Sequence, residues 1–318
     1  VDLQTVAMNV GAPSRTNCGK CHFYAGGGDN VKHGDLASTM ANPAKADDVH
    51  MGLDGQNMSC QECHESTDHG IAGQSLHSLA EGEASCTKCH TEANIHTNGT
   101  YDSHRDKIAC QTCHIPTFSR SMPTKMEWYW DEAGMTVDPI PTDMYGKPLY
   151  DKMKGRFVWG QDVKPEIRWH NGKWNRAIIG DNDKYDTLPN EHGSVVLGGP
   201  VAVKGDAGAK LYPFKKMMGR QGADAGNKTI LVPHLFGTGP GPNPYWVAYD
   251  WDKAFEEGAA WAGQTYTGTF EWIDTVMYLS LNHEIAPKAE ALTCNSCHGS
   301  EGLDWTGLGY GSNPYPIK

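Results

Sequence analysis

Residues 18–22 read CGKCH: two cysteines separated by two residues and followed at once by a histidine. The same arrangement returns four more times, so that all ten cysteines of the chain fall into Cys-x-x-Cys-His motifs. In chain order, the first to fifth motifs are CGKCH at 18–22, CQECH at 60–64, CTKCH at 86–90, CQTCH at 110–114 and CNSCH at 294–298. No cysteine is left over to act as a thiol catalyst.

This motif is typical of covalent haem attachment. Two cysteines at this spacing can each form a thioether to one vinyl group of haem, and the adjacent histidine then ligates the iron. Zinc sites and redox dithiols also use Cys-x-x-Cys, but neither needs a histidine at the next position five times out of five. We therefore predict five covalently bound haem c groups. The attachment residues are Cys18, Cys21, Cys60, Cys63, Cys86, Cys89, Cys110, Cys113, Cys294 and Cys297, and the proximal iron ligands are His22, His64, His90, His114 and His298.

The remaining histidines are candidates for the second axial ligand of each iron. The chain has 15 histidines, and six of those outside the motifs lie between residues 33 and 104, interleaved with the first four motifs. Neutral imidazole is a good iron ligand. Two imidazoles on one iron fill both axial positions, which blocks substrate binding and favours electron transfer. The favoured distal candidates are His33, His50, His69, His96, His104 and His283, with His77 in reserve.

Six favoured histidines for five irons leave one over. Either one assignment is wrong or one histidine serves a haem in a neighbouring subunit. His170 and His192 lie in polar, turn-rich sequence, where we expect ordinary roles, and His234 in VPHLFG is undecided.

Composition narrows the class of protein. The formal net charge of the 318 residues is −11, which argues against nucleic acid as a partner. Only 38% of residues are hydrophobic, and five haem rings would supply the missing apolar volume. The apolar runs are shorter than the ~18 residues of a membrane helix, so no transmembrane segment is expected. The chain begins at Val1 without a leader. This start, with haem attachment, predicts an exported protein, periplasmic or extracellular.

The motifs divide the chain unevenly. We expect a four-haem segment at 1–120, a haem-poor, aromatic-rich α+β segment at 121–290, and a fifth-haem segment at 291–318 packed on the rest. The fold class is a multihaem cytochrome c, mostly short helices and loops around stacked haems, with the α+β region wrapping them. Within that region, Asn171-Gly172 predicts a hairpin. Residues 249–261 and 269–283 are interpreted as helices, with Asp250 and Thr269 as possible caps.

Several stretches together resemble the octahaem tetrathionate reductase family of c-type cytochromes. They include GGGDNVKHGDL, DVHMG, IACQTCHIP, PTKMEWYW, LNHEIAPKAEALTCNSCH and GLDWTGLGY, and the similarity runs from near Val1 to near Tyr310. The resemblance implies a compact multihaem protein with mostly bis-histidine irons. It also implies distal roles for the matching positions His33, His50, His69, His96, His104 and His283.

One departure from that family bears on activity. Its members have a further N-terminal segment with three more haem motifs, which carries a catalytic haem whose distal ligand is a lysine. This chain starts where that segment would end. The resemblance therefore implies a five-haem, electron-transfer portion without the reducing site.

Two hypotheses of different class follow. The sequence favours a non-enzymatic electron-transfer protein whose partners are other redox proteins or extracellular acceptors, with self-association into a haem filament as a corollary. The alternative is a multihaem reductase of a small sulfur or nitrogen oxyanion at one open haem, for which KKMMGR, with Lys215, Lys216 and Arg220, is the one basic cluster to nominate. A third hypothesis makes the chain the electron feed of a larger complex.

Overall fold

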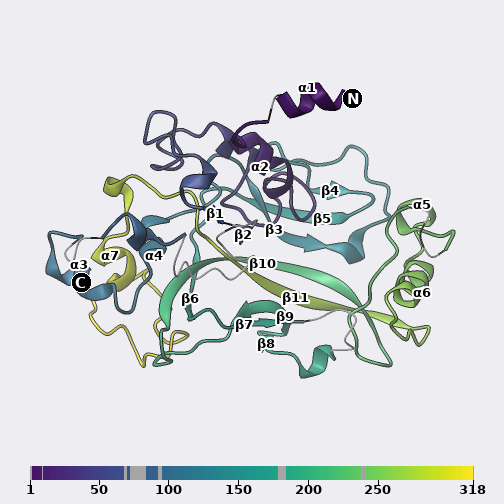
Figure 1. The fold of residues 1–318 in the computed structure, drawn as a ribbon. Coiled ribbons are helices and arrows are strands. Elements are labelled where there is room, and N and C mark those ends of the chain that lie inside the picture. The colour runs from purple at the N-terminus through teal and green to yellow at the C-terminus, as the bar shows by residue number, and fades with distance from the viewer. Residues whose placement is uncertain are drawn as a thin grey trace.

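A mixed β-sheet built from the middle of the chain forms the centre of the molecule. The nine described strands of this sheet join in the order β4-β5-β3-β10-β11-β9-β7, with β6 paired to β10 and β8 to β9. Figure 1 shows the two long strands β10 and β11 running through the molecule. The computed structural model describes residues 2–8, 10–67 (66–67 as backbone only), 70–71, 84–91, 95–177, 184–237, 239 and 241–317.

Most helices and strands are short, and the three longest are the strands β10 and β11 and the helix α6. The sheet consists of β3 (Thr124–Tyr129), β4 (Tyr150–Asp151), β5 (Gly155–Gly160), β6 (Glu166–His170), β7 (Trp174–Arg176), β8 (Asn190–Glu191), β9 (Ser194–Pro200), β10 (Lys210–Asp224) and β11 (Phe270–Ser280). A separate pair consists of β1 (Ser66–Thr67) and β2 (Gly70–Ile71). The α-helices are α1 (Leu3–Met8), α2 (Arg15–His22), α3 (Gly99–His104), α4 (Cys110–His114), α5 (Tyr245–Ala248), α6 (Trp251–Trp261) and α7 (Cys294–His298). Turns of 3₁₀ helix lie at Ser38–Ala41, Cys60–Glu62, Cys86–Lys88, Trp130–Glu132, Tyr185–Thr187 and Lys288–Glu290.

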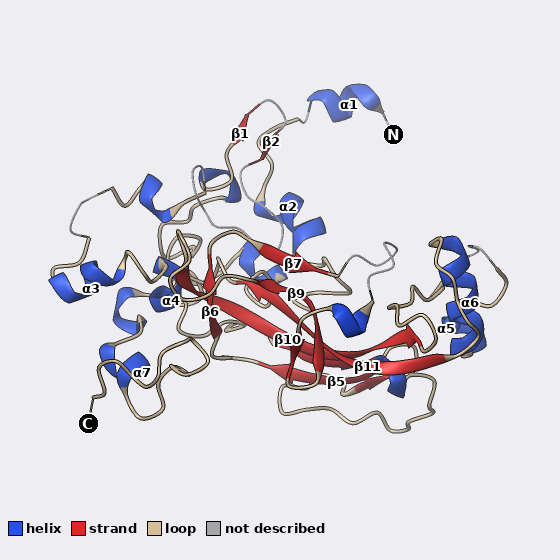
Figure 2. Ribbon diagram, turned by 90° about the horizontal axis from the view of Figure 1, so that it is seen from below, coloured by secondary structure: helices blue, strands red, loops and turns tan. Residues whose placement is uncertain are grey.

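The helices gather at the two ends of the sheet. Figures 1 and 2 both place α3, α4 and α7 together at one end and α5 and α6 at the other. In Figure 2, α1 projects away from the rest. Within the described residues, no helix has both the length and the apolar character needed to cross a bilayer.

The strand β11 corrects one prediction. The sequence pattern predicts a helix over residues 269–283, but Phe270–Ser280 is extended and pairs with β10 in an antiparallel ladder from Phe214↔Ser280 to Asp224↔Phe270. The helical interpretation is wrong because β-branched and aromatic side chains such as Thr275, Val276 and Tyr278 favour extended backbone, and β10 offers a full set of ladder partners. Thr269 therefore caps no helix.

The predicted hairpin at Asn171-Gly172 is also wrong in its pairing. Strands do form on both sides of this turn, but β6 pairs with β10 and β7 with β9. The chain thus changes partners at the turn, which a local turn signal does not reveal.

The helix α6 confirms the other interpretation. The Asp250 side chain accepts a hydrogen bond of 3.2 Å from the Lys253 backbone N–H and caps the helix. Phe255 of α6 lies against β10 at Gly222, where a Cβ atom would be 2.0 Å from the aromatic ring. Glycine is required there for this close approach.

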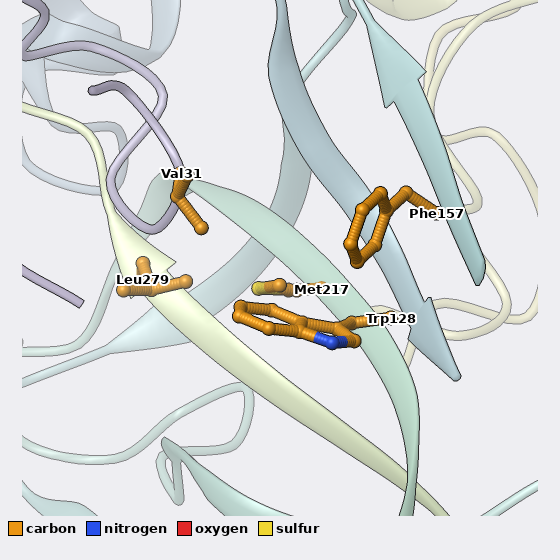
Figure 3. Packing of buried hydrophobic residues seen from close by; sticks show 5 residues of the cluster. All are labelled: Val31, Trp128, Phe157, Met217 and Leu279. Atoms are coloured by element: carbon orange, nitrogen blue, oxygen red, sulfur yellow. The ribbon is translucent and has the colours of Figure 1, made fainter. Parts of the chain in front are cut away.

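One hydrophobic cluster fastens the N-terminal part of the chain to the sheet. Figure 3 shows it: Val31 comes from the loop after α2, and Trp128, Phe157, Met217 and Leu279 come from four strands. All five side chains are buried. The first motif is therefore anchored on the same core as the central strands.

A core substitution tests the packing of the sheet. Phe214 is fully buried with Tyr212, Val276 and Tyr278. Phe214→Ala should lower the free energy of unfolding by about 3–5 kcal/mol, measured by guanidinium denaturation followed by circular dichroism. Phe236, 68% exposed, is the control, and Phe236→Ala should change stability by no more than about 0.5 kcal/mol. Equal losses in the two variants would contradict this packing.

Lys125 predicts a pH-dependent stability. Its ammonium nitrogen lies 3.2 Å from the ring centroid of Phe157 and 4.0 Å from that of Trp128, and burial lowers the pKa of Lys125 to about 7. An unfolded lysine has a pKa of about 10.4. Between these values the unfolded state binds more protons, so stability rises with pH. Relative to Lys125→Met, the wild type should gain up to about 1.4 kcal/mol of unfolding free energy per pH unit from pH 7 to 10. A difference that does not vary with pH would exclude a neutral Lys125.

Candidate functional site

Each motif occupies a short helical turn, as its spacing predicts. The first motif ends α2, the fourth and fifth form α4 and α7, and 3₁₀ turns begin at Cys60 and Cys86. Positions i, i+3 and i+4 of a helix lie on the same face. Both thiols and the imidazole of a motif therefore project to one side, where they can hold the edge of a flat ring and ligate its centre.

Polar side chains start several of these turns. Thr293 directly precedes the fifth motif and forms a reciprocal capping box with Ser296. Ser59 precedes the second motif and forms the same arrangement with Glu62, and Ser85 holds the N-cap position of the third. The two capping boxes, at Ser59 and Thr293, satisfy backbone N–H groups that have no partner in the first turn. A hydroxyl residue before the first cysteine was the sequence signal for this local structure.

The motifs form a row in chain order. Burial, and then the nearby Cys18 thiol, raises the pKa of Cys60, and the nearby Cys110 thiol raises the pKa of Cys86. Cys89 likewise acts on Cys63, and Cys297 and Cys294 act on Cys113. These pairs join the first motif to the second, the second to the third, the third to the fourth and the fourth to the fifth. The fourth and fifth motifs are neighbours although the whole sheet separates them in sequence.

Four motif histidines each face a second histidine across a gap. The ring centroids are 6.2 Å apart for His64 and His283, 6.2 Å for His90 and His50, 6.3 Å for His114 and His96, and 6.5 Å for His298 and His104. Two imidazoles that bind one metal ion from opposite sides, through bonds of about 2 Å, have centroids roughly 6 Å apart. The spacing of all four pairs therefore fits one iron atom between the rings.

At His114 and His104, the surroundings favour the neutral form of histidine. Burial, and then the nearby His96, lowers the pKa of His114. Burial, and then His298, lowers the pKa of His104. A histidine must be neutral to bind a metal. The surroundings of His114 and His104 therefore favour the protonation state that metal binding requires.

The first motif has a different environment. His33 is in electrostatic contact with His22, and burial lowers the pKa of His33, with Asp35 acting in the opposite direction. The other two sequence candidates, His69 and His77, lie outside the described residues. Of the sequence candidates, His33 is therefore the described histidine that lies near the first motif.

The other described histidines pair with no motif histidine in the ring contacts above. His170 on β6 is buried with its ring centroid 5.4 Å from that of Tyr212. His192 is exposed at the turn between β8 and β9. His234 is buried, and its Nδ1 lies 2.8 Å from a carboxylate oxygen of Glu257.

The basic cluster on β10 does not converge. Lys215 and Lys216 are consecutive in a strand and so point to opposite faces. Lys215 is fully buried, and its ammonium donates to the backbone carbonyl of Val31. Lys216 pairs with Glu191 at 2.5 Å, and Arg220 is held by two aspartates. The cluster that the reductase hypothesis nominated is therefore dispersed and neutralised.

Sequence reasoning missed the polar groups behind three of the facing imidazoles. The Nδ1 atoms lie 3.3 Å from Asp35 for His283, 3.1 Å from Asp102 for His96, and 3.1 Å from the side-chain oxygen of Asn313 for His298. None of these partners stands at a fixed spacing from its histidine, so no motif could have indicated them.

The donor set distinguishes haem from a bare metal ion. Within the described ranges, no cluster of three or more histidine, cysteine or acidic side chains could hold one ion. The thiols and imidazoles are instead distributed as helical turns that face a second imidazole. This arrangement fits a macrocycle attached at its edge and ligated on both faces, and it does not fit zinc.

Comparison with known proteins agrees with this geometry. Residues 125–301 match the profile of the family described as "Cytochrome c bacterial". Among solved structures, the octaheme cytochrome c from Shewanella oneidensis is similar at 40% identity and a TM-score of 0.86, over 99% of this chain and 70% of that chain. The chain belongs to the bacterial multihaem cytochromes c. No curated protein matches the sequence of this cytochrome.

Arg15 positions the second motif of the cytochrome beside the first. Its guanidinium is buried and donates to the Met58 carbonyl at 2.6 and 3.2 Å and to the Asn57 side chain at 3.1 Å. Hydrogen bonds to charged groups each contribute about 1.5–3 kcal/mol. Arg15→Ala should lower the free energy of unfolding by about 2–3 kcal/mol, measured by denaturation. Lys20→Ala, at an exposed position of the same helix, is the control and should have little effect. Arg15→Ala with wild-type stability would show that these contacts do not hold the two motifs together.

Proposed function

We propose that this cytochrome carries five covalently bound haem c groups, each with its iron between two imidazoles, and conducts electrons along them. The observation that carries the proposal is the set of four facing imidazole pairs at the spacing of one shared iron. The proposed pairs, proximal then distal, are His22 and His33, His64 and His283, His90 and His50, His114 and His96, and His298 and His104.

The chain's own residues have distinct tasks in this function. Haem supplies reversible one-electron chemistry at its iron. The motif cysteines hold each ring at a fixed place in the row, so that neighbouring sites stay close. The paired imidazoles occupy both axial positions and exclude water and small ligands from the iron. The row from α2 to α7 provides the conducting path.

The reductase alternative gains no support from the described residues. It needs an iron with one open axial position and cationic side chains converging on it. The second to fifth sites each have a facing second imidazole, and Lys216 and Arg220 are paired with carboxylates. Lys215 donates to the Val31 carbonyl and acts electrostatically on His33, so the first site is where the alternative is to be tested.

We propose the periplasm as the location, because haem c is attached outside the cytoplasm, and other redox proteins as partners. Extracellular acceptors and filament formation stay predictions from the sequence, since His69, the spare histidine that would ligate a neighbouring subunit's haem, is outside the described residues. Electron micrographs of the concentrated protein that show only monomers would contradict the filament.

Electron paramagnetic resonance of the oxidised protein tests the ligation. We expect five haems per chain, all low-spin. His283→Ala should remove one low-spin signal and produce one high-spin iron, because it opens one axial position of the second site. His192→Ala, at an exposed position, should leave every signal unchanged. A high-spin iron in the wild type, or a fully low-spin spectrum in His283→Ala, would contradict the proposed ligand pairs.

A further inference from the structure

A buried carboxylate stands behind the distal imidazole of the second site. Asp35 is 2% exposed, and one of its oxygens accepts hydrogen bonds from the backbone N–H groups of Asn282 and His283 at 2.8 and 3.0 Å. The same oxygen lies 3.3 Å from Nδ1 of His283. The acceptor at this imidazole is therefore a buried carboxylate oxygen that two backbone N–H groups hold in place.

The fourth site has the same arrangement from unrelated sequence. Asp102 on α3 lies 3.1 Å from Nδ1 of His96, and the Asp102 side chain is 13% exposed. Its carboxylate also accepts from the His96 backbone N–H at 3.3 Å and pairs with Arg105 at 3.6 Å. The imidazole and the carboxylate are thus fixed relative to each other by two contacts.

The third and fifth sites differ. Nδ1 of His50 is 4.0 Å from Asp48, beyond hydrogen-bonding distance. At the fifth site, Nδ1 of His298 meets the neutral amide oxygen of Asn313 at 3.1 Å. A carboxylate in direct contact with a ligating imidazole therefore distinguishes the second and fourth sites from these two.

We infer that Asp35 and Asp102 are positioning residues that lower the reduction potentials of the second and fourth haems by accepting the Nδ1 proton of their distal histidines. The inference rests on the proposed ligand pairs. When Nε2 binds the metal, Nδ1 carries the proton, and a carboxylate acceptor makes the imidazole a stronger donor. A stronger donor favours oxidised over reduced iron. The second and fourth haems of the row would then have the lowered potentials.

The test combines potentiometric titration with electron paramagnetic resonance. The signal lost in His283→Ala identifies the second haem, and the signal lost in His96→Ala identifies the fourth. Asp35→Asn should raise the potential of the second haem and change its g-values, because a neutral acceptor weakens the donor character of the imidazole. The first haem, whose proposed ligand His33 is also within the electrostatic reach of Asp35, should keep its g-values. Asp35→Glu, which keeps a carboxylate, should bring both the potential and the g-values of the second haem part of the way back to their wild-type values. Asp102→Asn should raise the potential of the fourth haem and change its g-values. Because the Asp102 carboxylate is more exposed than that of Asp35, its substitution should disturb folding less.

Asp224→Asn is the matched control. Asp224 is fully buried and accepts hydrogen bonds from Thr267, so this variant also removes a buried, hydrogen-bonded carboxylate. It should leave all g-values unchanged. If Asp35→Asn and Asp102→Asn change the potentials and g-values of the second and fourth haems no more than Asp224→Asn does, the inference is overturned. If His283→Ala and His96→Ala produce no high-spin iron, it is the ligand assignment that has failed instead.

Discussion

The opposition of two imidazoles across the width of one iron atom is the constraint on which the rest of this structure depends. One member of each pair is delivered locally, since a helical turn places it beside the two cysteines. The other must be brought by the tertiary fold to within about half an ångström of its place. Much of the architecture can be understood as the means of doing this for side chains that lie far apart in the chain.

The second site shows how the sheet contributes. β11 ends at Ser280, and the next residues are held by two buried aspartates, Asp35 at the Asn282 N–H and Asp48 at the Ile285 N–H. The chain then follows the fourth motif, with Ala286 donating to the His114 carbonyl and Leu292 to that of Cys113. The long ladder between β10 and β11 thus carries His283 to one site and then directs the fifth motif to its place beside the fourth.

The parts of this structure that the sequence predicts are those governed by local geometry. The five helical turns and the helix capped by Asp250 follow from spacing and residue chemistry. The distal roles of His50, His96, His104 and His283, which the family resemblance implies, stay proposals that the ring spacings support. The sequence predictions are wrong where the pairing of distant strands determines the local structure. Phe270–Ser280 has a pattern that suits a helix until β10 supplies a ladder, and Asn171-Gly172 turns between strands that belong to different neighbours. Asp35 and Asp102 were missed because a contact between a loop aspartate and a distant imidazole leaves no periodic trace.

The distribution of ligands along the chain also sets the order in which the protein can assemble. The second motif ends at His64, but the histidine that faces it, His283, lies beyond the entire sheet. In the proposed ligand set, the second motif is complete early in the chain, whereas its facing histidine would reach it only when β10 and β11 have paired. Full coordination of that iron would therefore depend on a completed sheet.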